Sequence, residues 1–149
     1  MEFAKSTFDT VQSLTGLRVV IDCANGAAYN TAPNTLHELG AEIVSMGVAP
    51  DGLNINEGCG ATAPDAMAQK VREASAQIGI GLDGDADRLI LSDETGGICN
   101  GDHILAALAL DMQTNGLLQG PVVGTVMSNL GLELLLAEKG IAFERAAVG

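Results

Sequence analysis

Three aspartates stand at alternate positions in one short stretch of this chain, Asp83-Gly84-Asp85-Ala86-Asp87-Arg88. Because only Gly and Ala separate them, the three carboxylates cannot move far apart, and their charges repel one another unless a cation neutralises them. Carboxylate oxygens select hard divalent ions such as Mg²⁺. Two aspartates beside glycine would indicate an ordinary solvated turn. Three of them, followed by the only Lys or Arg between Arg72 and Lys139, favour a metal site.

Two known metal-binding loops can be compared with this spacing. In a calcium-binding EF-hand the three aspartates would be the first ligands, and Glu94 would stand at the twelfth position. The sixth position of that loop requires Gly but holds Arg88, and Leu89-Ile90-Leu91 has the composition of a strand. A phosphatase of the haloacid-dehalogenase type would need Thr or Val where Asp87 stands. Neither pattern fits well, and a non-enzymatic acidic Ca²⁺-binding module is the alternative to an enzyme.

The elements around the loop can be predicted from hydrophobic patterning. The apolar run 78–82 precedes the aspartates and 89–91 follows them, so we expect a hairpin with antiparallel strands. Arg18-Val19-Val20-Ile21-Asp22-Cys23 is a β-branched run that ends at the breaker Ala24-Asn25-Gly26. A helix over about 31–39, ended by Gly40, and a strand over 41–48 would complete a parallel βαβ unit.

Two further helices are predicted from capping residues and apolar spacing. Thr62 is the expected N-cap of the first, whose sheet-facing positions are Met67, Val71 and Ala74. Asp102 is the expected N-cap of the second, with one apolar face formed by Ile104, Leu105, Leu108 and Met112.

The last part of the chain repeats the order of the first. Val122-Val123-Gly124-Thr125-Val126 precedes Ser128-Asn129, a leucine-rich helix ending at Gly140, and the strand-like Ile141-Ala142-Phe143. We therefore predict an α/β fold, with a mixed, mostly parallel sheet carrying helices on both faces, plus the opening βαβ of a second, similar domain. The expected boundaries are a lead-in over 1–16, the metal-binding domain over 17–114, a linker over 115–121 and an incomplete domain over 122–149.

Composition limits the function classes. The 149 residues contain 19 acidic and 7 basic side chains, a net charge of −12, which argues against phosphate neutralisation in a nucleic-acid binder. Only 3% of residues are aromatic, and no apolar run is long enough to span a bilayer. The three cysteines form no Cys-x-x-Cys pair, and the N-terminus lacks the apolar region of a signal peptide. We expect a cytoplasmic protein with no nucleic-acid or membrane partner.

The aspartate loop and three other segments together resemble the α-D-phosphohexomutase family. The loop is similar to that family's metal loop. The other segments resemble the branch of the family that acts on amino sugars. They are Val20-Ile21-Asp22-Cys23-Ala24-Asn25-Gly26-Ala27, Gly52-Leu53-Asn54-Ile55-Asn56 with Cys59-Gly60-Ala61-Thr62, and Gly124-Thr125-Val126-Met127-Ser128-Asn129-Leu130-Gly131. The resemblance covers nearly the whole chain. One departure is Ala86, where the family usually has Gly; if the backbone there has positive φ, Ala costs about 1 kcal/mol.

This resemblance implies a reversible conversion of glucosamine 6-phosphate into glucosamine 1-phosphate, on the route to UDP-N-acetylglucosamine and peptidoglycan precursors. A phosphoserine would exchange its phosphoryl group with the sugar through a bisphosphate intermediate. Mg²⁺ on Asp83, Asp85 and Asp87 would contact the phosphoserine, and Arg88 would bind phosphate.

The family's phosphoserine loop, sugar-reading loop and fourth-domain phosphate site have no counterpart here, so no catalytic residue is expected in this chain. The partners implied are a phosphorylated amino sugar and the missing domains of the same protein. We expect the chain alone to be inactive and its tail to be mobile, to pair at a sheet edge or to swap between copies in a homo-oligomer.

Overall fold

The computed structural model describes residues 2–8 and 13–148. The chain forms two compact units, Met1–Ile98 and Cys99–Gly149. None of the helices in the described part of the chain has the length and apolar character that a bilayer crossing requires.

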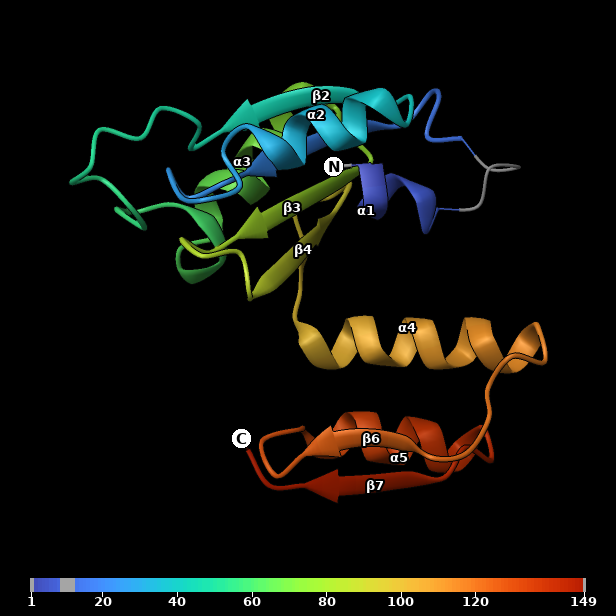
Figure 1. Cartoon of the computed structure of the whole chain (residues 1–149). Helices are drawn as coiled ribbons and strands as arrows, with labels where there is room; N and C mark the ends of the chain where they lie inside the picture. The colour runs from blue at the N-terminus through green and yellow to red at the C-terminus, as the bar shows by residue number, and fades with distance from the viewer. Residues whose placement is uncertain (1, 9–12, 149) are drawn as a thin grey trace. The chain divides into compact units, whose positions relative to one another are not determined.

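The first unit is built on a five-stranded sheet of order β2-β1-β3-β4-β5 (Figure 1). Its elements in chain order are α1 (Glu2–Ser6), β1 (Arg18–Asp22), α2 (Thr31–Glu38), β2 (Glu42–Met46), the 3₁₀ turn η1 (Gly60–Thr62), α3 (Asp65–Ala74), β3 (Ile78–Leu82), β4 (Leu89–Asp93) and β5 (Ile98–Cys99). Strand β1 pairs in parallel with both β2 and β3, and β4 pairs antiparallel to β3. The predicted mixed α/β fold, the first βαβ unit and the hairpin are therefore confirmed.

Helix α3 packs closely on one face of this sheet. Val20 points to that face and forms a fully buried cluster with Met67, Val71 and Ala76. The close approach depends on Gly79 of β3, because a Cβ there would lie 2.1 Å from Met67 Sδ and 2.7 Å from Val71 Cγ2. The absence of a side chain at this position lets the helix rest almost on the strand backbone.

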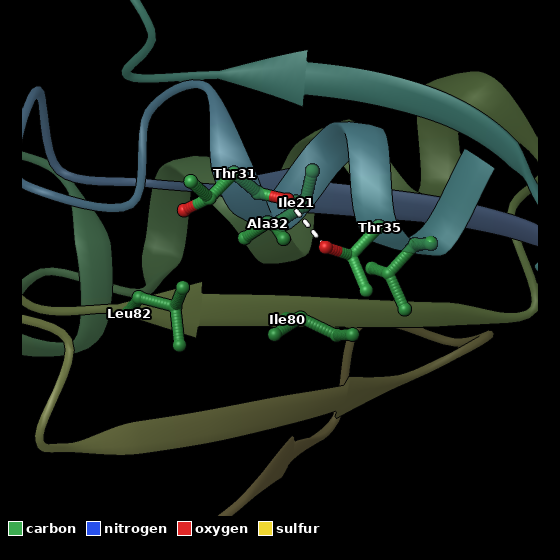
Figure 2. A pocket seen from close by; sticks show the side chains of 7 residues that line it. Ile21, Thr31, Ala32, Thr35, Ile80 and Leu82 are labelled. Atoms are coloured by element: carbon green, nitrogen blue, oxygen red, sulfur yellow. Dashed lines mark hydrogen bonds between the residues drawn. The ribbon is translucent and has the colours of Figure 1, made fainter. Parts of the chain in front are cut away.

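Helix α2 lies on the opposite face, so helices lie on both faces of the sheet as predicted (Figure 1). It covers its face less completely than α3 does. No residue of α2 is buried. Between α2 and the sheet lies an apolar groove of about 500 Å³, and Figure 2 shows Ile21, Ile80 and Leu82 lining it beside residues of α2. Thr35 Oγ1 donates a hydrogen bond of 2.7 Å to the Thr31 carbonyl within the helix itself, so this hydroxyl is not directed at a ligand. The groove offers surface for packing and no group that could do chemistry.

The predicted start of α3 is wrong. Thr62 ends η1, and the N-cap position of α3 is Pro64. The Thr62 hydroxyl donates to the Cys59 carbonyl at 3.5 Å instead of accepting from a helical N–H. Pro64 fixes the backbone of the helix start and has no N–H to satisfy, so the helix begins there without a side-chain cap. Met67 and Val71 face the sheet as predicted.

The second unit contains α4 (Gly101–Thr114), β6 (Val122–Thr125), α5 (Leu130–Glu138) and β7 (Phe143–Ala146). Strands β6 and β7 pair in parallel across α5, which confirms the second βαβ unit. Its core is the buried cluster Ala109, Val122, Leu132, Leu136 and Ile141.

Helix α4 belongs to the second unit, whereas the sequence assigned residues 101–114 to the first domain. Ala109 packs in the second core, and Leu108 and Met112, expected on the buried face, are 56% and 39% exposed. The N-cap of α4 is Asn100, not Asp102. The Asn100 side chain accepts from the N–H groups of Asp102 and His103, and His103 Nδ1 accepts from the Asn100 N–H in return. Asp102 instead accepts from the Asn129 N–H at 3.0 Å, joining α4 to the start of α5.

Replacement of Gly79 by Ala tests the contact between α3 and β3. The new Cβ would overlap Met67 and Val71, so we expect the free energy of unfolding to fall by about 1–3 kcal/mol in urea titrations. Gly101→Ala is the control, because no atom lies within 4 Å of a Cβ built there. Equal losses for the two variants would contradict the packing described.

The turn between β4 and β5 predicts a pH dependence of stability. Asp93 Oδ1 accepts from the Thr95 hydroxyl at 2.7 Å, from the Gly97 N–H at 2.7 Å and from the Thr95 N–H at 2.9 Å. These hydrogen bonds favour the ionised form and lower the pKa of Asp93. Burial has the opposite effect on the pKa, but a smaller one. Its contribution to stability is therefore present above the ordinary aspartate pKa and is lost as pH falls through the lowered value.

We expect Asp93→Asn to have a lower thermal midpoint than wild type near neutral pH. The difference should shrink as pH falls below the ordinary aspartate pKa toward the lowered value, because the wild-type carboxylate is then progressively protonated in the folded state. A difference that stays constant from neutral pH to full protonation would show that the charge of Asp93 does not contribute.

Candidate metal centre

The aspartate loop lies at the carboxyl ends of the parallel strands. Residues 83–88 connect β3 to β4, where Leu82 pairs with Leu89. The loop after β1 also reaches this edge of the sheet, because the Ala27 N–H donates a 2.7 Å hydrogen bond to the Gly84 carbonyl. The loop after β2 reaches it too, since a Cβ on Gly84 would lie 2.6 Å from Ile55 Cδ1. Ligand sites of open α/β sheets form at this edge.

The structure brings the three predicted ligands together. One carboxylate oxygen from each of Asp83, Asp85 and Asp87 lies within 4.8 Å of the other two. Asp83 is buried, while Asp85 and Asp87 are exposed. This donor set is all oxygen and carries three negative charges, and two of its three members are exposed to solvent. The residues fit a hard divalent cation such as Mg²⁺.

Arg88 holds the buried member of the cluster. Its Nε donates to Asp83 Oδ2 at 2.6 Å, and its backbone N–H donates to Asp83 Oδ1 at 3.1 Å. Burial alone would raise the pKa of Asp83, but these two hydrogen bonds and the guanidinium charge outweigh it and lower the pKa. Asp83 is therefore kept ionised, the form that a metal requires.

The crowding of the carboxylates affects the titration of Asp87. The charges of Asp85 and Asp83 raise the pKa of Asp87, and Arg88, whose Nε lies 3.7 Å from Asp87 Oδ1, offsets this only in part. A divalent cation between these oxygens would remove the repulsion. The charge pattern of the loop thus favours occupancy by a cation.

The interpretation of Arg88 as a phosphate ligand stays a prediction. The structure shows its Nε on Asp83, while 65% of the side chain is exposed. The guanidinium can therefore hold Asp83 with one edge and still face solvent. A phosphate brought to the cation would meet this charge at short range.

The calcium-loop alternative does not fit the structure. Glu94 lies in the turn after β4, beyond Asp93, which pairs with Ile78 at the opposite end of the hairpin. A strand rises about 3.3 Å per residue, so Glu94 is roughly 16 Å along the chain from Leu89. It cannot supply the twelfth-position ligand of an EF-hand, because β4 is an extended strand and not part of a calcium loop.

A cavity of about 350 Å³ adjoins the aspartate loop. It is lined by side chains and backbone from the three loops described above, among them Asn25, Tyr29, Asn54, Ile55, Gly84 and Asp85. Asp85 therefore belongs both to the metal cluster and to the wall of this hollow, so a molecule in the cavity would lie next to the cation.

Sequence reasoning missed the role of Asp22. This carboxylate ends β1 and is fully buried, as is Asp83 at the end of β3. The available signal was an acidic residue closing a β-branched run immediately before a turn. The sequence pattern predicts Asp22 only as part of a strand and indicates no function for it.

Comparison with known proteins identifies the family. The profile of the phosphoglucomutase/phosphomannomutase alpha/beta/alpha domain II matches residues 1–97, and that of domain III matches residues 100–149. The chain belongs to the phosphoglucomutase/phosphomannomutase family, which confirms the resemblance to the phosphohexomutases. The two matches also meet where the structure divides the chain.

Individual relatives with a more specific name than the family match the whole of this chain. The chain is 57% identical over 149 residues to a phosphoglucosamine mutase of Polynucleobacter asymbioticus, covering 100% of this chain and 33% of that protein. It is 56% identical over 149 residues to a phosphoglucosamine mutase of Aeromonas salmonicida, with 100% and 34% covered. The chain thus spans about a third of the length of these relatives.

A solved structure shows the same fold. A phosphoglucomutase/phosphomannomutase family protein from Burkholderia thailandensis superimposes with a TM-score of 0.79 at 27% identity, covering 92% of this chain and 31% of that one.

The backbone at Ala86 predicts a stabilising substitution. Ala86 has φ of +60°, the left-handed conformation in which a Cβ is disfavoured. We expect Ala86→Gly to raise the free energy of unfolding by up to about 1 kcal/mol in urea titrations. Ala66→Gly, at an exposed position of α3, is the matched control and should lower it by about the same amount. Loss of stability in both variants would show that the turn at residue 86 is not strained.

Proposed function

We propose that this chain is the metal-holding part of a phosphoglucosamine mutase, which interconverts glucosamine 6-phosphate and glucosamine 1-phosphate. The observation that carries the proposal is the convergence of three aspartate oxygens within 4.8 Å beside an arginine. The names of the relatives supply the substrate, and their length leaves two thirds of the protein to provide the phosphoserine and the sugar-binding groups. We place this activity in the cytoplasm.

The residues of this chain have defined tasks in such a reaction. Asp83, Asp85 and Asp87 would hold Mg²⁺, with Asp83 kept ionised by Arg88. Mg²⁺ held by these carboxylates would neutralise charge on the phosphoryl group that is exchanged between serine and sugar. Arg88 adds a second positive charge beside that group. The chain itself would neither donate nor accept the phosphoryl group, so turnover needs the remaining domains.

Calorimetric titration of the 149-residue chain with Mg²⁺ and with Ca²⁺ tests the site. We expect Asp85→Asn to weaken Mg²⁺ binding by at least about tenfold, because one ligand loses its charge while the exposed side chain keeps its shape. Glu94→Ala should leave binding unchanged, since Glu94 lies at the other end of β4. Tight Ca²⁺ binding that is lost in Glu94→Ala would instead establish the non-enzymatic calcium module.

The activity itself is tested in the longer protein that contains this chain. We expect it to convert glucosamine 6-phosphate in the presence of Mg²⁺, and Asp85→Asn to lower kcat. The 149-residue chain should show no turnover. Conversion by the short chain alone would contradict the assignment of the phosphoserine to another domain.

A further inference from the structure

Asp22 is a buried carboxylate that the proposed reaction does not use. Among the described residues, Asp22, Asp83 and Ser92 are the polar or charged residues that are buried, and Asp22 has no exposed surface at all. A carboxylate in such a place is costly unless hydrogen bonds satisfy it. Its Oδ1 accepts from the Ala24 N–H at 3.0 Å and its Oδ2 from the Gly60 N–H at 2.8 Å. The two donors belong to two different loops, which this one side chain joins.

The first of these loops has a strained turn. Ala24 and Asn25 have φ of +53° and +50°, a conformation that residues with a Cβ rarely adopt twice in succession. The turn is held by the Asp22 carboxylate on Ala24, by the Asn25 N–H on the Gly47 carbonyl at 2.7 Å, and by the Gly26 N–H on the Cys23 carbonyl at 2.8 Å. Strained backbone of this kind persists where several interactions determine it together.

This turn ends against the aspartate loop. Gly26 lies so close to Gly84 that a Cβ on it would be 2.2 Å from the Gly84 carbonyl oxygen. The next residue, Ala27, donates its N–H to that same oxygen at 2.7 Å. Gly84 separates Asp83 from Asp85, so its position affects both ligands.

The second loop touches the other side of Asp83. A Cβ on Gly60 would lie 2.3 Å from the Leu82 carbonyl oxygen and 2.5 Å from Ala24 Cβ. Leu82 is the residue before Asp83. The two loops fastened by Asp22 therefore contact the residues immediately before and after the buried ligand.

We propose that Asp22 is a positioning residue of the metal centre. By accepting one hydrogen bond from each loop, its carboxylate fixes the backbone on both sides of Asp83, and so the spacing of the three ligand oxygens. The inference rests on the proposed function only for the identity of the ligand; the coupling between Asp22 and the aspartate loop is a property of this chain.

Replacement of Asp22 by Asn tests the coupling with almost no change of shape. An amide has a single acceptor oxygen and turns two donor hydrogens toward the other N–H, so one of the two loops loses its hydrogen bond. With Mn²⁺ as the probe, followed by its electron paramagnetic resonance signal at low temperature, we expect affinity to fall by about 10- to 100-fold. Amide hydrogen exchange at Ala27, whose partner is Gly84, should become faster.

Two further variants separate positioning from loss of stability. Ser92 is equally buried, and its hydroxyl donates to the Asp93 carbonyl at 3.0 Å, near the opposite end of the hairpin. Ser92→Ala should lower the thermal midpoint and leave both Mn²⁺ affinity and exchange at Ala27 unchanged. Gly26→Ala keeps Asp22 intact but pushes Gly84 away, and should weaken Mn²⁺ binding as Asp22→Asn does.

The outcomes distinguish the inference from the proposed function. Wild-type exchange at Ala27 in Asp22→Asn, or the same loss of Mn²⁺ affinity in Ser92→Ala, would overturn the positioning role. If the wild-type chain bound no Mn²⁺, the metal function would fail, while exchange at Ala27 in Asp22→Asn would still decide whether Asp22 controls the loop.

Discussion

The candidate metal centre must hold three mutually repelling carboxylates close together within one six-residue loop. The loop is placed where the chain reverses between β3 and β4, so that both of its ends are fixed by strand pairing. Arg88 then holds Asp83 by two hydrogen bonds, and two neighbouring loops pack against the backbone of Leu82 and Gly84. Burial of Asp83 with exposure of Asp85 and Asp87 leaves one side open to a cation and its remaining ligands. Strand pairing in the sheet thus holds the three like charges in place against their mutual repulsion.

The close contacts among these loops explain the choice of small residues. Gly26, Gly60 and Gly84 each lie where a Cβ would approach a neighbouring atom to less than 3 Å. The backbones meet almost directly, and a carboxylate rather than an apolar side chain lies between them because N–H groups must be satisfied there. Asp22 and the glycines therefore have the same effect, because each allows peptide groups from separate loops to come together.

Local patterns were enough to predict most of the fold. The β-branched run 19–21, the apolar runs around the aspartates and Gly40 identified β1, the hairpin and the end of α2. The errors have both local and distant causes, and the local one is Pro64, which replaces Thr62 as the N-cap of α3. Both Asn100 and Asp102 are good capping residues; Asn100 caps α4 in a capping box with His103, and Asp102 accepts from the distant Asn129 N–H instead. The exposure of Leu108 and Met112 likewise follows from which side of α4 meets the second core. For the site, the spacing of Asp83, Asp85 and Asp87 was enough to predict that they form one cluster. The role of Asp22 could not be predicted in this way, because it depends on a hydrogen bond from Gly60, 38 residues away.

The two faces of the five-stranded sheet differ in how completely a helix covers them, because α3 has buried residues and α2 has none. Strand β1 and the inner side of α3 are almost fully buried, so they can separate only when the whole unit unfolds. Helix α2 has no buried residue and lies over a groove of about 500 Å³, so lifting it exposes less new apolar surface than separating α3 from β1 would. We therefore expect local unfolding of α2 to cost less free energy than global unfolding. We therefore expect local opening on the face opposite α3, and the aspartate loop to stay attached to the strands of the sheet.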